Sequence, residues 1–509
     1  MPPIAFSTTA KRRAVLRAGA AGLAVLVPGT RTQAAGSQIV VAQVSDALTL
    51  DPTVDTSAIG INLFLNIFDQ LSQITADGGV APNLAESWEV NDDQTVWTFT
   101  IRDNVLFHDG GKLTIDDVLW TYRKILADAK SPNRAYLTKI KTLDRLDDRR
   151  LRFTLLEPFV TFDRQVSLIS IVPRAAYEKL GPRQFSLTPV GSGPFKVRRW
   201  EKDSALELEA NMAYWGGAPK VQKVIFRPVP SEASRAAALL SGELDIVPVL
   251  PPTLVDMLSN RPGVKIVKVV SNRAVFAGFN TRDAVVANEK LRLAINHAID
   301  REAITQKLLR GMGVPLGQLA TPPLFGYDPT LKPPTYDVAL AKRLVAESGY
   351  AGQKIVFQYP TNRFAFADQT AQAIDGYLRA VGIAVELQPM EFSALFPLWV
   401  EDKLSALYLF SMGITIMDAD LLLNLEYESA TSHAYWSSPE VDELSRKQRA
   451  EKDPAKRKQA MARIWRLSQE HAAFVPLYSE IQAYGVREGI EWRPRPDERL
   501  KFKDAVVKG

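Results

Sequence analysis

Side chains able to carry out covalent chemistry are few and scattered in this sequence. Cys is absent, which removes thiolate nucleophiles, disulfides and Cys-based metal sites together. The four His residues stand at positions 108, 297, 433 and 471, and none forms a His-Glu-x-x-His pair. The Gly-x-Ser-x-Gly and Ser-x-x-Lys patterns of activated serines do not occur either. A carboxylate pair could still serve a hydrolase, so a secreted hydrolase remains an alternative.

The elements of the first half of the chain are short and mixed. Alternating apolar residues predict strands at 39–44, 96–101 and 151–155. Apolar residues at helical spacing predict a helix at 62–74, and Thr114 with Asp117 predicts a capped helix to about residue 126. Ser231 and Gly242 mark the beginning and end of a further helix, before a strand at 245–247.

Past about residue 275 the elements alternate in type. Strands are predicted at 354–359, 383–387 and 407–411, and helices at 288–311, 337–349, 367–381, 392–401 and 453–471. Strands separated by helices of this length need crossover connections, so we expect a parallel sheet and an α/β fold. The composition changes most between Val270 and Thr281, with no Pro- or Ser-rich linker. The last predicted strand covers 474–478.

The first thirty-five residues are typical of an export signal. Lys11-Arg12-Arg13 precedes an apolar run at 18–27, and Thr32-Gln33-Ala34-Ala35 supplies small residues for cleavage. The Arg12-Arg13 pair resembles a twin-arginine signal, with an ordinary secretion signal as the alternative. The segment holds five basic and no acidic residues, so the rest of the chain has 57 of each. This balance argues against nucleic acid as a partner, and the missing Cys argues against a lipid anchor.

Several motifs, in a fixed order, resemble those of one known family. They include Asn83-Leu84-Ala85-Glu86-Ser87-Trp88, Phe107-His108-Asp109-Gly110, Gly191-Ser192-Gly193-Pro194-Phe195, Ser241-Gly242-Glu243-Leu244-Asp245-Ile246 and Val475-Pro476-Leu477-Tyr478. The likeness is to the family 5 solute-binding proteins of ABC importers for peptides, nickel, glutathione or opines, and it covers nearly the whole chain after residue 35.

The resemblance implies a fold and a division into domains. The chain would be an α/β, two-lobed periplasmic binding protein, type II-like, of the large cluster with an extra subdomain in the first lobe. The first lobe would contain residues 36–274 and 472–509, with the inserted subdomain at about 62–188. The second lobe would contain residues 275–471, which agrees with the change in element order.

Arg363 is a candidate for a ligand carboxylate. A peptide enclosed between lobes needs an acid for its ammonium and an Arg for its carboxylate, since both lose their water. Arg363 ends the loop Pro360-Thr361-Asn362-Arg363, which follows the strand at 354–359. In dipeptide-binding relatives a similar Pro-x-x-Arg loop carries the Arg that meets the ligand carboxylate. A solvated loop Arg is the alternative.

Asp418 and Asp420 are the candidates for a ligand ammonium, because they follow the strand at 407–411. Relatives have a Gly-Trp turn here, then an ammonium-binding Asp and a later Asp-Pro. In this chain Ile414 replaces the Trp and Met417 takes the place of that Asp. Asp418 is therefore one residue away, and Asp420 matches the later Asp and is better explained as a helix cap than as a ligand contact. This departure puts recognition of a free peptide N-terminus in doubt.

Two further segments could line the site. Tyr435 and Trp436 follow His433 in a loop, although packing alone would also explain them. Thr53 and Ser57, with Thr56 between them, belong to the segment 50–61 after the first strand.

Taken together, these features predict a periplasmic receptor that closes over a short peptide or peptide-like solute and passes it to an ABC importer permease. An opine, a sugar derivative or a metal chelate is the alternative ligand. We expect no enzymatic activity, cofactor, metal or nucleic-acid partner, and a monomer.

Overall fold

The computed structural model describes residues 37–361, 363–431 and 433–508, all of which belong to one of the two units of the chain. The predicted export signal at 1–35, its twin-arginine pair, and Asn362 of the Pro-x-x-Arg loop lie outside the described residues. Within the described part, no helix is both long enough and apolar enough to cross a membrane.

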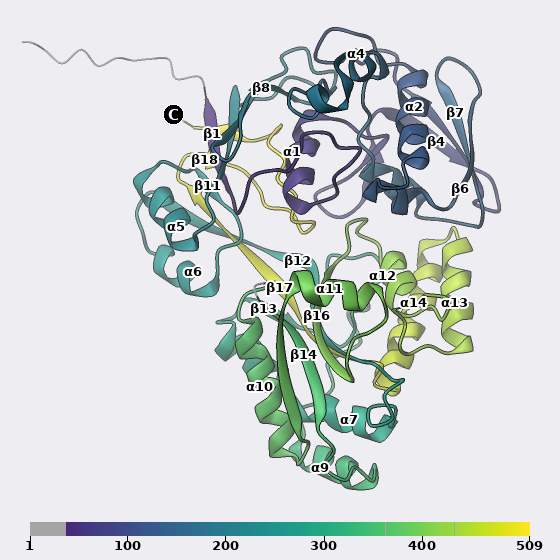
Figure 1. Cartoon of the computed structure of the whole chain (residues 1–509), viewed down its shortest axis with the longest axis vertical. Helices are drawn as coiled ribbons and strands as arrows, with labels where there is room; N and C mark the ends of the chain where they lie inside the picture. The colour runs from purple at the N-terminus through teal and green to yellow at the C-terminus, as the bar shows by residue number, and fades with distance from the viewer. Residues whose placement is uncertain (1–36, 362, 432, 509) are drawn as a thin grey trace, which may run out of the picture. The chain divides into compact units, whose positions relative to one another are not determined.

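The largest sheet of the described residues has eleven strands (Figure 1). Ten of them follow one another in the spatial order β15 (Val385–Glu391), β14 (Ile355–Thr361), β16 (Leu407–Gly413), β12 (Val264–Phe279), β17 (Phe474–Arg487), β11 (Ile246–Val247), β1 (Gln38–Gln43), β10 (Lys223–Pro228), β9 (Ala205–Ala210) and β8 (Phe195–Glu201). The eleventh, β13 (Gly313–Pro315), pairs with β17.

The long antiparallel strands β12 and β17 connect the two ends of this sheet. β17 also pairs with β11, and β12 also pairs with β16, so each strand reaches a different neighbour. Their mutual register shifts between Val270 and Ala274, where a bulge interrupts the ladder. Bulges increase the local bend of a strand, so the pair is irregular near the predicted boundary at 274/275.

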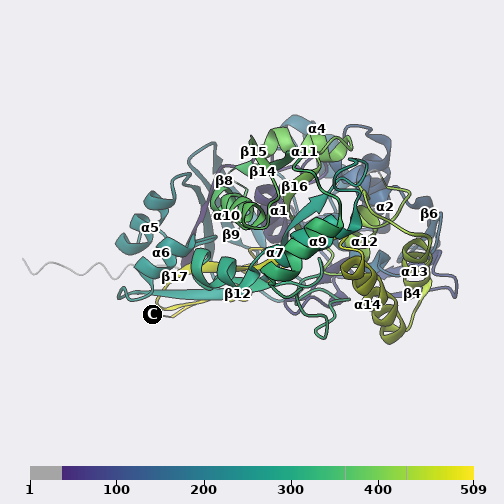
Figure 2. The ribbon, with the colours of Figure 1, turned by 90° about the horizontal axis from the view of Figure 1, so that it is seen from below.

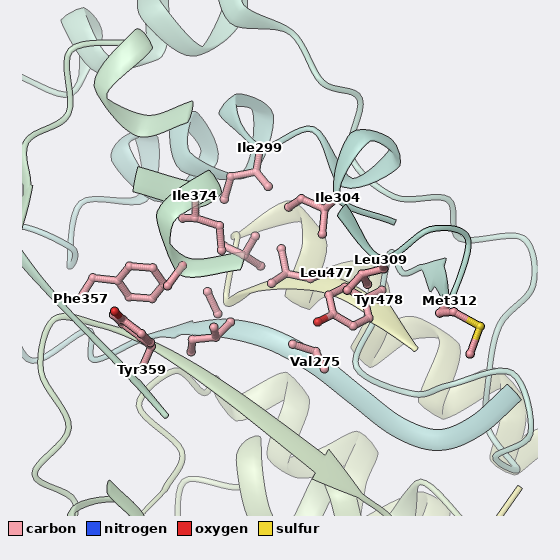
Figure 3. Packing of buried hydrophobic residues seen from close by; sticks show 14 of the residues in the cluster. Val275, Ile299, Ile304, Leu309, Met312, Phe357, Tyr359, Ile374, Leu477 and Tyr478 are labelled. Atoms are coloured by element: carbon pink, nitrogen blue, oxygen red, sulfur yellow. The ribbon is translucent and has the colours of Figure 1, made fainter. Parts of the chain in front are cut away.

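The strands β14, β15 and β16 form the predicted parallel unit. Side chains of β16 alternate between two cores: Leu407 and Leu409 join one apolar cluster, and Tyr408 and Phe410 join another. The helix α10 (Ala367–Ala380) contributes to the first cluster and α11 (Phe392–Val400) to the second, so they cover opposite faces (Figure 2). Figure 3 shows the first cluster, in which Ile374 of α10, Phe357 of β14 and Leu477 of β17 lie near one another.

A separate sheet lies within the first half of the chain. It has the order β4 (Ala85–Val90), β5 (Val96–Ile101), β7 (Arg150–Leu155) and β6 (Ile140–Arg145), all antiparallel. Its apolar face packs with α2 (Ile115–Ala127), which begins with the predicted capping box of Thr114 and Asp117. Two short ribbons complete the sheets of the described residues: β2 (Ser72–Ile74) with β3 (Val80–Pro82), and β18 (Ile490–Glu491) with β19 (Val506–Val507).

The remaining α-helices of the described residues are mostly short. They are α1 (Ala58–Ile67), α3 (Phe162–Gln165), α4 (Arg174–Phe185), α5 (Glu232–Ser241), α6 (Pro252–Leu258), α7 (Glu289–Ala298), α8 (Arg301–Ala303), α9 (Val338–Glu347), α12 (Asp420–Glu426), α13 (Pro439–Ala450) and α14 (Pro454–Glu470).

Two predicted helices are wrong in their extent. The helix predicted at 62–74 begins earlier, because Ser57 caps α1, and it ends at Ile67, after which residues 72–74 form β2. The helix predicted at 288–311 is broken at Ile299. There the side chain of Asp300 accepts a hydrogen bond from the backbone of Ala303 and starts a new turn.

Candidate functional site

A pocket with about 680 Å³ of atom-free space lies among segments from distant parts of the chain. We call it the main pocket. Its lining residues are Pro52, Asp55, Thr56, Ile61, Phe64, Leu65, Gln70, Gln73, Ile74, Asn133, Tyr136, Ser167, Leu168, Ser170, Thr415, Arg495, Asp497, Arg499 and Lys501. The wall is therefore apolar along α1, neutral and polar on several loops, and charged along the C-terminal segment.

The segment at 50–61 supplies one wall of the main pocket. Asp55 and Thr56 line the pocket. Ser57 instead caps α1, accepting a hydrogen bond from Gly60 N at 3.0 Å, and its own N–H and hydroxyl donate to the Asp55 carboxylate at 2.7 and 2.9 Å. Thr53 is buried and donates its hydroxyl to Asp51 at 2.7 Å. The hydroxyls of Thr53 and Ser57 thus hold the segment in place and do not line the pocket.

The C-terminal segment supplies the charged wall. Every second residue from Arg495 to Lys501 lines the main pocket, whereas Leu500 and Phe502 point into the apolar core. Arg495 is fixed by its hydrogen bonds to the carbonyl oxygens of Ile74 and Thr75, at 2.9 and 3.2 Å. Its Nε also donates to Asp497 at 2.9 Å, so the charges of these two residues compensate each other.

Arg499 and Lys501 differ from Arg495, because their side chains make no hydrogen bond or ion pair within the described part of the chain. Both residues are half-buried. Loss of solvent lowers the pKa of the Arg499 guanidinium. It also lowers the pKa of Lys501 to about 8, helped by the nearby charge of Arg495 and opposed by Asp497, Asp69 and Asp504. The pocket therefore holds two cations that are poorly hydrated and not directly paired.

Arg363 lies outside the main pocket. Its guanidinium stands 4.3 Å from the centre of the Phe392 ring, a cation–π contact. Crowding by protein atoms, together with the charge of Arg273, lowers the pKa of Arg363 to about 10, so it stays charged at neutral pH. Arg273 is itself paired with Glu498 at 2.8 Å and with Glu480 at 3.3 Å. Arg363 therefore adds a cation beside an existing ion network.

Asp418 and Asp420 are engaged within the protein. Asp418 is fully buried, and both of its oxygens accept hydrogen bonds at 3.0 Å from Arg457. Asp420 begins α12 and accepts hydrogen bonds from Gln448, from Arg449 at 3.1 Å and from Thr161 at 3.1 Å. A ligand ammonium would have to displace an internal ion pair to reach either carboxylate.

Tyr435 and Trp436 take part in aromatic packing. The Tyr435 ring lies 5.8 Å from that of Tyr408, and its hydroxyl accepts a hydrogen bond from Leu404 N at 3.1 Å. The Trp436 ring lies 5.8 Å from that of His471. None of the seven residues predicted to bind ligand lines the main pocket, although Thr56 and Thr415 come from two of the predicted segments.

The pocket residues that sequence reasoning missed come mainly from 64–74 and 133–170, and four charged ones belong to the C-terminal segment. The signal for those four was the recurrence of charged residues at 495, 497, 499 and 501, with Glu498 as a further charged residue, in a segment with no helical spacing. Such alternation places charges on one side of an extended chain. The described residues contain no group of three or more His, Asp or Glu side chains placed to hold a metal ion.

Comparison with known proteins identifies the class. Residues 79–434 match the model of the bacterial extracellular solute-binding proteins, family 5, and the chain belongs to this family. It is 25% identical to the probable D,D-dipeptide-binding periplasmic protein DdpA of Escherichia coli K12, over 90% of this chain and 91% of that protein.

Solved structures share the fold. HbpA2 from Haemophilus parasuis superposes with a TM-score of 0.85 at 23% identity, covering 93% of this chain and 100% of that one. The ABC transporter-associated periplasmic binding protein DppA from Helicobacter pylori, in complex with the peptide STSA, gives a TM-score of 0.79 at 25% identity, covering 93% and 98%. The predicted family and α/β fold class are confirmed.

Proposed function

We propose that this protein is an exported receptor that binds a short peptide or peptide-like solute and delivers it unchanged to the permease of an ABC importer. The main pocket carries the proposal, because it joins apolar walls, neutral hydrogen-bonding groups and charged side chains.

We assign the binding movement to the two predicted lobes, residues 36–274 with 472–509 and residues 275–471. Two features support a hinge. The strand β12 crosses the proposed boundary at 274/275, and its ladder with β17 is interrupted between Val270 and Ala274. Thr415 would come from the second lobe and the other lining residues from the first, so a bound solute would touch both lobes and favour the closed state.

The compartment and partners follow from the same proposal. A relative named as periplasmic and the export signal predicted at 1–35 both support the periplasm as the place of action. The receptor would act as a monomer, bind no nucleic acid and need no cofactor.

A solute screen with product analysis tests this function. We expect isothermal titration calorimetry against a dipeptide and tripeptide library to find ligands at micromolar or lower dissociation constants. Mass spectrometry should recover these ligands intact after prolonged incubation. Catalytic formation of products would support the secreted hydrolase instead, and binding restricted to opines, sugar derivatives or metal chelates would replace the peptide as ligand.

Arg363→Ala tests the remaining prediction from the sequence. If the ligand carboxylate meets Arg363, the variant should bind a peptide roughly 10- to 100-fold more weakly, the usual loss for a charged hydrogen-bond partner. Unchanged affinity would remove Arg363 from the site. Arg379→Ala is a suitable control, because Arg379 is an exposed Arg of the neighbouring helix α10, paired with Asp375.

A further inference from the structure

We propose that Arg499 and Lys501 form an oxyanion subsite of the main pocket, so that the protein selects solutes carrying a carboxylate or a phosphate. The inference rests on the proposed solute-receptor function and specifies its ligand class. It concerns two cations on the C-terminal segment, which the family model's match at residues 79–434 does not cover.

The main pocket leaves these two cations without a direct partner among the described residues. Arg499 and Lys501 both line the main pocket, and neither side chain makes an ion pair or hydrogen bond to any described residue. Moving a cation out of water is costly unless an anion or several acceptors replace the water. A ligand oxyanion would supply that compensation, and two adjacent cations suit the two or more oxygens of a carboxylate or phosphate.

The nearby carboxylates already accept hydrogen bonds from other residues of the protein. Asp497 is bound by Arg495, and the two Asp55 oxygens accept hydrogen bonds from Ser57. Asp69, which acts on Lys501 from a distance, is fully engaged by other side chains. It accepts hydrogen bonds from the Ser192 hydroxyl at 3.0 Å, the Tyr214 hydroxyl at 2.9 Å and the Trp215 indole at 3.0 Å.

Two further acids act on Arg499 and Lys501. Glu498 feels the charge of Arg499, but its carboxylate is paired with Arg273 at 2.8 Å. Asp504 is exposed and pairs with Lys503 at 3.3 Å. The counter-charge that would complete the pocket must therefore come from the solute.

The arrangement also predicts which end of a peptide-like solute matters. Of the two pocket carboxylates, Asp497 is paired with Arg495, whereas Asp55 accepts two neutral hydrogen bonds from Ser57 and keeps its charge; Asp418 is bound to Arg457 outside the pocket. A ligand ammonium is thus offered the single carboxylate of Asp55, whereas a ligand oxyanion is offered two cations. Blocking the carboxyl group of the solute should therefore cost more affinity than blocking its amine.

Calorimetry with matched probes tests the subsite. The probes are a dipeptide set, the same set N-acetylated, the same set with C-terminal amides, and glycerol phosphate with inorganic phosphate. We expect the N-acetylated acids or the phosphates to bind the wild-type protein, and the C-terminal amides to bind at least roughly 10-fold more weakly than the acids. Preference for the acids or for the phosphates identifies the source of the oxyanion.

Variants connect the selectivity to the two side chains. Arg499→Gln and Lys501→Gln should each weaken binding of the anionic probe roughly 10- to 100-fold, and Arg499→Lys should restore part of it. Arg493→Gln removes an exposed cation of the same segment outside the pocket and should leave affinity unchanged. The oxyanion subsite would be overturned if the wild-type protein bound acids and amides equally. It would also be overturned if a variant carrying both Arg499→Gln and Lys501→Gln still preferred acids over amides. Either result would leave the receptor function intact. Recovery of chemically altered probe would overturn the receptor function and leave the subsite standing.

Discussion

The buried ion pair between Asp418 and Arg457 gives the sharpest stability prediction. Replacing Asp418 with Asn keeps the size of the side chain and removes its charge. Arg457 is also buried, with its side chain 7% exposed, and donates the rest of its hydrogen bonds to Gln448. Its positive charge would then lack the only carboxylate that contacts it directly among the described residues. Removing one partner of a buried pair typically costs about 3–5 kcal/mol of unfolding free energy.

Urea denaturation followed by tryptophan fluorescence measures this loss for Asp418→Asn. The matched control is Asp256→Asn, since Asp256 pairs with Arg310 at 2.6 Å but both side chains are about half exposed. Exposed pairs contribute at most about 1 kcal/mol, so the control should differ little from the wild type. A loss of about 3–5 kcal/mol for Asp418→Asn alone would establish the pair as structural.

A loss of stability for Asp418→Asn no larger than that for Asp256→Asn would refute a structural role for the buried pair. The same variant also decides between the two roles considered for Asp418. A ligand-binding Asp418 would lower peptide affinity at least tenfold with little change in stability. A structural Asp418 would lower stability and leave the affinity of the folded protein nearly unchanged.

Three further predictions concern other buried or crowded groups. Burial raises the pKa of Glu426 to about 8, so the folded state retains a proton that the unfolded state releases, and stability falls as pH rises from about 4.5 to 8. Thermal melts should find Glu426→Gln no different from wild type at pH 5 and more stable by about 2–4 kcal/mol at pH 9. A Cβ on Gly191 would lie 2.0 Å from Ile67 O, so Gly191→Ala should cost about 1–3 kcal/mol in urea. Gly376→Ala, inside α10 with open space around it, should stabilise by about 0.5–1 kcal/mol, and equal effects of the two would contradict the packing argument. Because the pKa of Lys501 is about 8, calorimetric affinity for an anionic probe should fall above pH 8, by up to about tenfold per unit, and Lys501→Gln should abolish this dependence.

Local signals predicted those elements that local interactions define. Ser231 caps α5 with a hydrogen bond from Ser234 N, and Gly242 ends it with a positive φ of 79°, both at the residues expected. The parallel unit of β14, β15 and β16 was predictable because its strands are apolar and its connections long enough to be helices.

Elements that depend on tertiary contacts were predicted less well. The strand predicted at 474–478 continues to Arg487, through Ser479, Glu480 and Gln482, which no apolar pattern would include. Those polar residues are accommodated by long-range partners: the Ser479 hydroxyl donates to Ser271 O at 2.9 Å, and Glu480 pairs with Arg273. Sequence spacing carries no information about partners two hundred residues away.

The same limit explains the candidate site. Sequence patterns indicated the 50–61 loop and the loop after β16, and both contribute residues to the main pocket. They could not indicate which side chains of these loops are already bound to other parts of the protein. Thr53 and Asp418 have side chains that could bind a ligand, but they form hydrogen bonds within the protein. The Thr53 hydroxyl donates to Asp51, and the Asp418 carboxylate accepts from Arg457. Arg499 and Lys501 come from a segment with no family motif, yet both line the main pocket, and neither side chain makes an ion pair with a described residue. A residue's chemical type therefore predicts what it can bind, whereas the partners it has already acquired decide whether it is available to a ligand. On that criterion the cations of the C-terminal segment, and not the aspartates after β16, should determine which solutes this receptor accepts.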